Sequence, residues 1–312
     1  MTNPKWLAGC APGTRRELAG ALYNNARMIG VDVRDGERFG LRQGEEGITD
    51  RVLLDLCRKI PGLKITKFTH KREAANGADW EWWIPTATGR WFAFRIQAKK
   101  LLNSSTGRGK YDFSYKVDST SKSQLQTLID TARIDGIPAV YALYNQAGSS
   151  RYSAHRHIHG CVTPTAGQGV TVIAAKAVEQ AFGSNPAAVE DVQWLSLPWS
   201  CLAHCPGRRA VLYDSMLSDM VGSSGLRGGD SADEGLGVSI ARHVWRLMLL
   251  RSETPADAPL DWAYEYLGET GVFREPPDYV PVDDANVELD SGRHPLAELG
   301  MAPRYVAAFA PE

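Results

Sequence analysis

The feature that most constrains the fold of this chain is a pair of alternating segments joined by a short turn. Residues 78–84 carry apolar side chains at the even positions and place Asp79 on the opposite side. Residues 91–99 alternate in the same way, with apolar even positions and with Gln97 on the other side. Residues 86–89 have the composition of a turn, so the pattern predicts an antiparallel hairpin in which Asp79 lies across from the neighbourhood of Gln97.

The polar side of this hairpin carries groups suited to a divalent cation and a water molecule. Asp79 supplies a carboxylate, and either the Gln97 amide or the Ala98 carbonyl supplies a neutral oxygen, which are the hard ligands that Mg²⁺ takes. Lys99 shares the strand face of Gln97, where its ammonium can orient or deprotonate a water and offset negative charge on a phosphorus-centred transition state. The same residues also suit a solvated surface hairpin, so the spacing alone leaves both interpretations open.

The order of these residues resembles the PD-(D/E)XK nuclease superfamily. An acidic helical segment is followed by Gly-Ala-Asp79 on one strand and by Gln97-Ala-Lys99 at the end of the next. In the Mrr-like restriction endonuclease variant of that superfamily, Gln replaces the second acid, as it does here. The resemblance covers about residues 40–145. A group of bacterial proteins without an assigned function is also similar in its Gly-Ala-Asp-Trp-Glu-Trp-Trp and Gln-Ala-Lys-Lys pattern.

The resemblance implies a fold class and an activity. The expected fold is α/β, with a restriction-endonuclease-like mixed β-sheet core flanked by helices. The expected activity is that of an endonuclease that uses Mg²⁺ or Mn²⁺ to hydrolyse phosphodiester bonds in nucleic acid, with DNA as the expected substrate and restriction or anti-phage defence as the setting. Because Gln in place of an acid lowers the negative charge of the site by one, the alternative is a catalytically inactive nuclease fold that binds nucleic acid or protein as a sensor or scaffold.

The superfamily also carries a Glu on a helix before the first core strand. Apolar residues at helical spacing predict such a helix over residues 46–60. Glu46 is the preferred candidate, although Glu45 begins a neighbouring helical stripe and an acid at either position suits the helix dipole. Glu81 shares the face of Asp79 and either joins the metal site or is a charge at its rim. The predicted catalytic residues are Glu46, Asp79, Gln97 and Lys99; the predicted magnesium ligands are Asp79, Glu46 and Gln97, with Glu45 and Glu81 as alternatives.

A basic stretch with interleaved aromatic residues follows the hairpin. The side chains predicted to contact nucleic-acid phosphates are Lys100, Arg108, Lys110, Lys116 and Lys122. The aromatic residues at 111, 113 and 115 either stack on bases or form one buried strand face. A helix over 123–135 and a buried strand over 139–144 then predict the strand, helix, strand unit expected of a nuclease core.

A second candidate metal site combines thiols and imidazoles. Cys201 and Cys205 have a spacing usable for one half of a structural zinc site, which Cys161 and His159 would complete. The spacing matches no specific zinc-finger pattern, and buried thiols with surface histidines are the more common arrangement.

The chain is predicted to have four parts. They are an N-terminal helical segment (1–40), a nuclease-like domain (41–220), a Gly- and Ser-rich loop (221–237) and an acidic helical extension (238–312). Residues 253–312 hold 13 acidic and 3 basic residues, which leaves 32 basic and 23 acidic residues in 1–252. The basic part is expected to attract polyanions such as nucleic acid.

Composition also bears on location and assembly. Five irregularly spaced cysteines do not form a secreted disulfide framework. No apolar stretch reaches the length of a membrane span, and no signal peptide is recognisable, so a cytoplasmic protein without a membrane partner is expected. Because cutting both strands of a duplex favours two symmetry-related sites, a homodimer is a further expectation.

Overall fold

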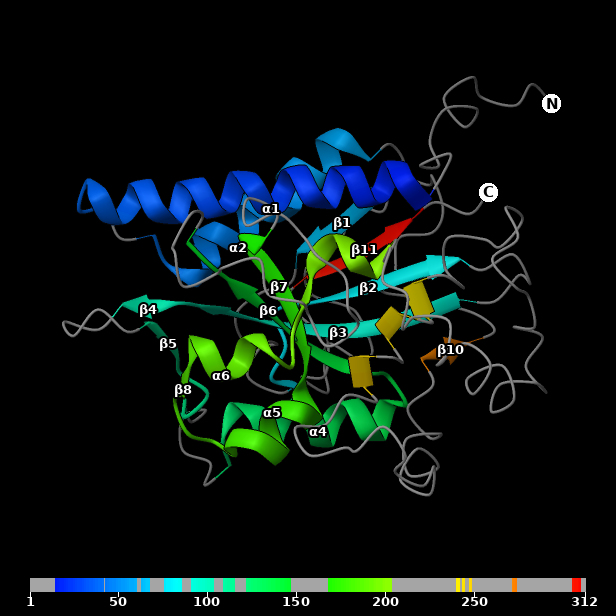
Figure 1. The fold of residues 1–312 in the computed structure, drawn as a ribbon. Coiled ribbons are helices and arrows are strands. Elements are labelled where there is room, and N and C mark those ends of the chain that lie inside the picture. The colour runs from blue at the N-terminus through cyan, green and yellow to red at the C-terminus, as the bar shows by residue number, and fades with distance from the viewer. Residues whose placement is uncertain are drawn as a thin grey trace, which may run out of the picture.

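Within the described part of the chain, an eight-stranded mixed β-sheet forms the centre of the molecule (Figure 1). The structure is a computed structural model, and it describes residues 15–41, 43–60, 63–67, 76–85, 91–103, 109–115, 122–146, 168–203, 240, 241, 243, 244, 247, 248, 271–273 and 305–309. The strands lie in the order β1 (Leu63–Lys67), β11 (Tyr305–Phe309), β2 (Trp80–Pro85), β3 (Trp91–Lys100), β6 (Ala139–Tyr144), β7 (Val170–Ala174) and β9 (Leu197–Pro198), with β10 (Val272–Phe273) pairing with β3 beside this row.

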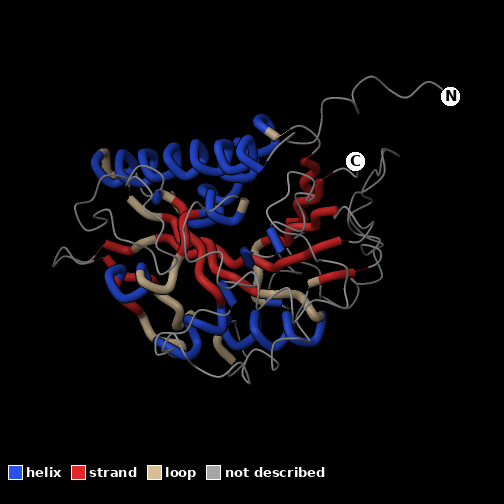
Figure 2. Tube along the Cα trace, turned by 45° about the vertical axis from the view of Figure 1, so that its right-hand side comes forward, coloured by secondary structure: helices blue, strands red, loops and turns tan. Residues whose placement is uncertain are grey.

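Helices cover both faces of the sheet, as the two views in Figures 1 and 2 show. On one side lie α1 (Arg15–Arg38) and α2 (Glu45–Lys59), and on the other lie α4 (Gln124–Asp135) and α5 (Ala175–Phe182). The short elements α6 (Val189–Gln193), η3 (Trp199–Leu202), β4 (Leu102–Asn103), β5 (Gly109–Tyr111) and β8 (Ala187–Ala188) complete the described part, the last three as a small sheet. The expected mixed β-sheet flanked by helices is therefore confirmed.

The register of the β2–β3 hairpin places Asp79 across from the neighbourhood of Gln97, as expected. Trp80 pairs with Ile96, and the Asp79 N–H donates to the Ile96 carbonyl at 2.9 Å. On the apolar side of β2, the Trp80 and Trp82 rings contact the Trp199 ring of η3, with centroids 6.4 and 5.9 Å apart. This aromatic packing lies on one face of the hairpin, so Asp79, Gln97 and Lys99 share the opposite face.

The connection from β3 to β6 contains α4, which lies against the polar face of the hairpin. Ser123 caps α4 by accepting a hydrogen bond from the Gln126 N–H at 3.1 Å, and Gly136 ends the helix at a φ of 67°. The chain then returns as β6, parallel to β3, in the register that pairs Gln97 with Tyr141. A parallel pair requires a long connection of this kind, which places α4 against the polar face of the hairpin.

Segments predicted to lie outside the core contribute to the same sheet and core. Strands β10 and β11 come from the expected acidic extension, and β11 lies between β1, to which it is antiparallel, and β2, to which it is parallel. Helix α1, predicted as a separate N-terminal segment, places Leu18, Leu22 and Ile29 in the shared core. Residues 240, 241, 243, 244, 247 and 248 are helical, whereas the predicted loop at 221–237 lies outside the described residues.

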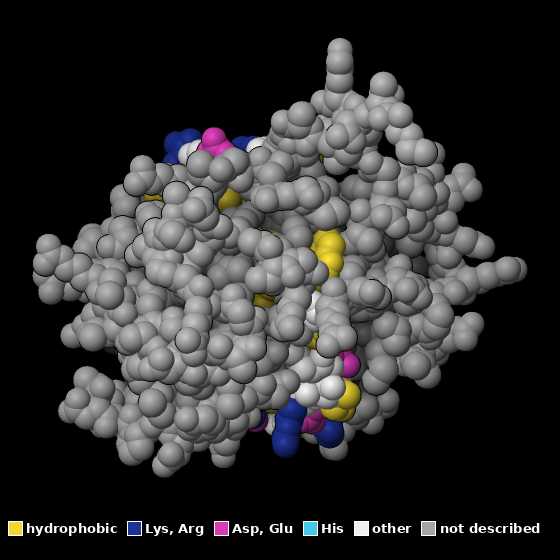
Figure 3. Space-filling model, turned by 90° about the vertical axis from the view of Figure 1, so that its right-hand side faces the viewer, with side chains coloured by type: hydrophobic (Ala, Val, Ile, Leu, Met, Phe, Trp, Pro, Cys, Tyr) yellow, Lys and Arg dark blue, Asp and Glu magenta, His cyan; other side chains and the backbone are white. Residues whose placement is uncertain are grey.

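Figure 3 views the molecule from the end nearest β10. On that face the described charged side chains lie at the upper and lower margins, with hydrophobic side chains between them. The predicted site residues lie toward the other end of β3. Among the helices that the structure describes, none is both long and apolar enough to cross a membrane.

Candidate active site

A tight turn before β2 positions Asp79. Gly77 has a φ of 71°, and a Cβ at this position would lie 2.7 Å from the Leu128 nitrogen of α4. The Ala78 N–H donates to the Asn76 side-chain oxygen at 3.1 Å, which closes the turn. Glycine is thus required both by the left-handed conformation and by the close approach of α4. The turn therefore places Asp79 on the polar face of the hairpin.

The Asp79 carboxylate is linked to Lys99 through two amide side chains. Asp79 Oδ2 accepts from the Ala98 N–H and from Gln97 Nε2, both at 2.7 Å. Gln97 Oε1 accepts from Gln124 Nε2 at 3.1 Å, and Gln124 Oε1 accepts from Lys99 Nζ at 2.8 Å. The structure therefore brings Asp79, Gln97 and Lys99 together on one face, with Gln124 of α4 joining them.

Glu45, the first residue of α2, approaches the same end of β3. Its Oε2 accepts from the Lys100 N–H at 2.9 Å, and its Oε1 lies 3.9 Å from Lys99 Nζ. The Ala98 and Lys100 amides are two residues apart and point to the same edge of β3, because the amides at odd positions, such as Arg95, point toward β6. These two amides are spaced about 7 Å along the strand. The carboxylates of Asp79 and Glu45 therefore bind neighbouring amides on the same edge of β3. This part of the edge lies beyond Ile96, the last residue of β3 that pairs with β2.

The structure corrects the choice between the two helical acids. Glu46 is exposed, whereas Glu45 contacts Lys99 and Lys100. The residues of α2 that face the core are Ile48, Thr49, Val52, Leu53 and Leu56. Glu45 continues the stripe of Thr49, Val52 and Leu56, so the buried side of the helix indicates which acid faces the sheet.

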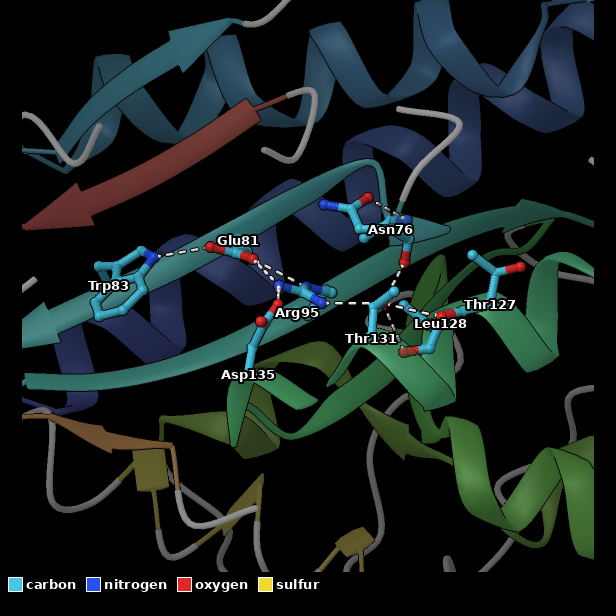
Figure 4. Close-up of polar contacts among 9 residues, drawn as sticks. Asn76, Glu81, Trp83, Arg95, Thr127, Leu128, Thr131 and Asp135 are labelled. Carbon is cyan, nitrogen blue, oxygen red and sulfur yellow. Dashed lines mark hydrogen bonds and ion pairs between the residues drawn. The ribbon is translucent and has the colours of Figure 1, made fainter. Parts of the chain in front are cut away.

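Glu81, predicted as an alternative metal ligand or a rim charge, belongs to a buried ion-pair network (Figure 4). Its Oε1 lies 2.7 Å from Arg95 NH2, and its Oε2 accepts from Trp83 Nε1 at 3.0 Å. Arg95 also donates to Asp135 at 2.6 Å and to Thr131 at 3.1 Å, both on α4. The network fastens β2, β3 and α4 together beside the site.

Gln97, a predicted magnesium ligand, makes hydrogen bonds through both ends of its amide. Its Nε2 donates to Asp79 and to the Ala98 carbonyl at 3.1 Å, while its Oε1 faces Gln124. Gln97 therefore holds the Asp79 carboxylate in place.

Burial controls the electrostatics of the site. It raises the pKa of the Glu45 carboxyl, and the nearby Lys99 ammonium opposes that effect. Burial likewise raises the pKa of the Tyr141 and Tyr144 phenols, and the charges of Asp79 and Glu45 raise both further. The Tyr144 hydroxyl is hydrogen-bonded to Thr49 Oγ1 at 2.9 Å. The negative charges of Asp79 and Glu45 therefore raise the pKa of the same two buried tyrosines.

Two further residues near the site have no counterpart in the predicted set. Hydrogen bonds from Ser114 lower the pKa of Asp112, with help from Lys99 and Lys110. Gln124, the first residue of α4, holds Lys99. The signal for Gln124 was present in the sequence, because it follows the Ser123 cap of the helix that packs on the polar face of the hairpin.

The predicted nucleic-acid contacts are only partly within the described residues. Lys110 is exposed on β5, whereas Lys100 donates to the Gln43 carbonyl at 3.1 Å and Lys122 pairs with Asp130 at 2.9 Å. Arg108 and Lys116 lie outside the described residues. Of the three aromatic residues at 111, 113 and 115, the first two are buried and the third is 56% exposed, with Lys99 Nζ 5.8 Å from its ring centroid.

The predicted zinc site falls largely on residues that are not described. His159, Cys161 and Cys205 lie outside them, and Cys201 is buried in η3. The described residues contain no group of three or more His, Cys, Asp or Glu side chains arranged for a metal. The candidate cation site consists of two acids, Asp79 and Glu45, which the Ala98 and Lys100 amides hold and whose hard oxygens match what Mg²⁺ prefers.

Comparison with known proteins supplies a family. The model of a family of unknown function, DUF6615, matches residues 18–304. The chain belongs to this family. No curated protein matches the chain, and no solved structure does. The family match begins within α1 and includes the β2–β3 hairpin, α4 and β10.

Proposed function

We propose that this protein is a divalent-metal-dependent nuclease that hydrolyses phosphodiester bonds in nucleic acid, with DNA as the substrate. The observation that carries the proposal is the pair of carboxylates, Asp79 and Glu45, anchored on the Ala98 and Lys100 amides at one edge of β3. Lys99 lies beside them with a side chain that is only 9% exposed. Two carboxylates suffice for Mg²⁺, which usually keeps several waters and binds substrate phosphate as well.

The order of elements around the pair supports the same proposal. An acid at the start of α2 precedes the β2–β3 hairpin, and α4 then leads to the parallel strand β6. This is the order expected from the sequence resemblance to PD-(D/E)XK nucleases. Restriction or anti-phage defence in the cytoplasm, with two protomers acting on the two strands of a duplex, is the setting that we propose for it.

The residues of the site have distinct roles in this proposal. Asp79 and Glu45 would hold Mg²⁺, which when bound lowers the pKa of a water and offsets negative charge on the phosphate. Gln97 and the Ala98 N–H orient the Asp79 carboxylate, and Gln124 orients the Lys99 ammonium. Lys99 then holds the attacking water and balances the charge that grows on the phosphoryl group.

Cleavage of a supercoiled plasmid tests the proposal. Wild-type protein is expected to nick or linearise the plasmid with Mg²⁺ or Mn²⁺ and to do neither with EDTA. Asp79→Asn keeps the size of the side chain but removes its charge, and we expect a loss of cleavage on the order of 10²-fold or more. Asp130→Asn, on the outer side of α4, is the matched control and should cleave as the wild type does. Cleavage by Asp79→Asn at the wild-type rate would contradict the proposal.

A second candidate function is supported by the orientation of Gln97. Its Nε2 donates to Asp79 at 2.7 Å, so an amide stands where the superfamily commonly has a second acid. A site with one negative charge fewer favours a protein that binds nucleic acid without cutting it. The same assay separates the two functions, because a binding protein retards the plasmid on a gel without producing nicks.

A further inference from the structure

We propose that Tyr141 is a positioning residue of this site, whose hydroxyl donates a hydrogen bond to a water molecule beside Asp79. The inference rests on the proposed function, because it assigns a further residue to the same cation site.

The sheet places Tyr141 in line with Asp79 and Gln97. Asp79 directly precedes the Trp80–Ile96 pair, so it lies opposite Gln97, and Gln97 in turn pairs with Tyr141 of β6. Neighbouring strands are about 4.8 Å apart, and paired residues point to the same face. The three side chains therefore form a row on the polar face of the hairpin. Gln97 fills its middle and contacts Asp79 directly.

Tyr141 differs from the other buried tyrosines in its hydrogen bonding. The Tyr111 hydroxyl donates to Asn145, and the Tyr144 hydroxyl pairs with Thr49. The Tyr141 hydroxyl is also fully buried, yet within the described part of the chain it has no hydrogen-bond partner. Nearly all buried polar groups are hydrogen-bonded, and leaving one unsatisfied costs about 1–3 kcal/mol. A phenylalanine would fill the same volume without that cost, and a ligand that accepts a hydrogen bond from the hydroxyl would offset it.

The groups around Tyr141 indicate which kind of ligand its hydroxyl can bind. The Phe113 ring meets the Tyr141 ring edge to face at 5.1 Å, which fixes the plane of the phenol. Because burial and the two acids disfavour its ionisation, the phenol keeps its proton and acts as a donor. A water accepts this hydrogen bond and can donate in turn to the Asp79 carboxylate. Such outer partners commonly tune metal affinity or activity by about 10–100-fold.

The test compares Tyr141→Phe with a matched buried tyrosine, Tyr111→Phe. Mg²⁺ and Mn²⁺ binding is measured by calorimetry, stability by thermal unfolding, and cleavage by single-turnover assay. Tyr141→Phe should weaken cation binding by about 10-fold without lowering the melting temperature. Tyr111→Phe removes the hydrogen bond that the Tyr111 hydroxyl donates to Asn145, so it should lower the melting temperature and leave cation binding unchanged.

The outcomes separate this inference from the proposed function. If Tyr141→Phe binds both cations as the wild type does, the inference is overturned even when the wild type cleaves DNA. If the wild type binds cations but does not cleave, a weaker affinity in Tyr141→Phe supports the inference, and only the proposed function fails. A wild-type protein that binds neither cation would overturn both.

Discussion

Replacing Arg95 by methionine tests the buried ion pair that joins β2 to β3 beside the site. Arg95 is 1% exposed and Glu81 is 0% exposed, so the substitution leaves a carboxylate in the core without its cation. Removing one partner of a buried ion pair costs about 3–5 kcal/mol. The Trp83 hydrogen bond to Glu81 at 3.0 Å remains in the variant, and Asp135 is 32% exposed and can be hydrated. We therefore expect the free energy of unfolding to fall by about 3 kcal/mol, near the lower end of that range.

Urea unfolding followed by tryptophan fluorescence measures this loss. A double variant, Arg95→Met with Glu81→Leu, removes both charges and should lose about 1–3 kcal/mol less than the sum of the two single variants. A loss below about 1 kcal/mol in Arg95→Met, or strict additivity in the double variant, would refute the reasoning. Because Glu81 is assigned to this network, Glu81→Gln should also leave the Mg²⁺ affinity unchanged.

Three further predictions follow from the same geometry. Because burial raises the pKa of Glu45, Mg²⁺ affinity should fall on acidification at a higher pH than for an ordinary glutamate, whereas without metal the Glu45 contribution to stability should be lost as pH rises through that pKa; calorimetry and melting curves of Glu45→Gln should lack these two Glu45 contributions. Truncation at residue 252 removes β10 and β11 and leaves β2 without one neighbour, so circular dichroism should show the loss of cooperative unfolding. Gly77→Ala, at a φ of 71° and with a Cβ 2.7 Å from the Leu128 nitrogen, should destabilise the protein by more than about 1 kcal/mol in urea unfolding.

The local parts of the fold were predictable because their signals are periodic. Alternation predicted the β2–β3 hairpin with Asp79 across from the neighbourhood of Gln97, and the positions of Ser123 and Gly136 marked the ends of α4. The pairing of Glu81 with Arg95 was also open to prediction, because the same register places them directly opposite each other. Treating Glu81 as a metal ligand overlooked that cross-strand partner.

The parts that escaped prediction depend on contacts distant in sequence. Strand β11 pairs with β1 and β2 across more than 200 residues, and no local pattern indicates which strands a short apolar segment will join. The choice of Glu45 over Glu46 depends on how α2 is rotated against β3, which its buried stripe determines. The orientation of the Gln97 amide depends on Gln124, which approaches from another layer. None of these contacts can be inferred from the spacing of the hairpin residues.

The proposed nuclease activity requires a cation site at the edge of β3 and the neighbouring Lys99 ammonium. The most direct test is plasmid cleavage by Lys99→Met, measured together with its Mg²⁺ affinity, because Lys99 is assigned to the water and the phosphate and not to the cation. We predict that this variant binds Mg²⁺ at least as well as the wild type and has lost cleavage. A Lys99→Met protein that nicks the plasmid at the wild-type rate would contradict the account.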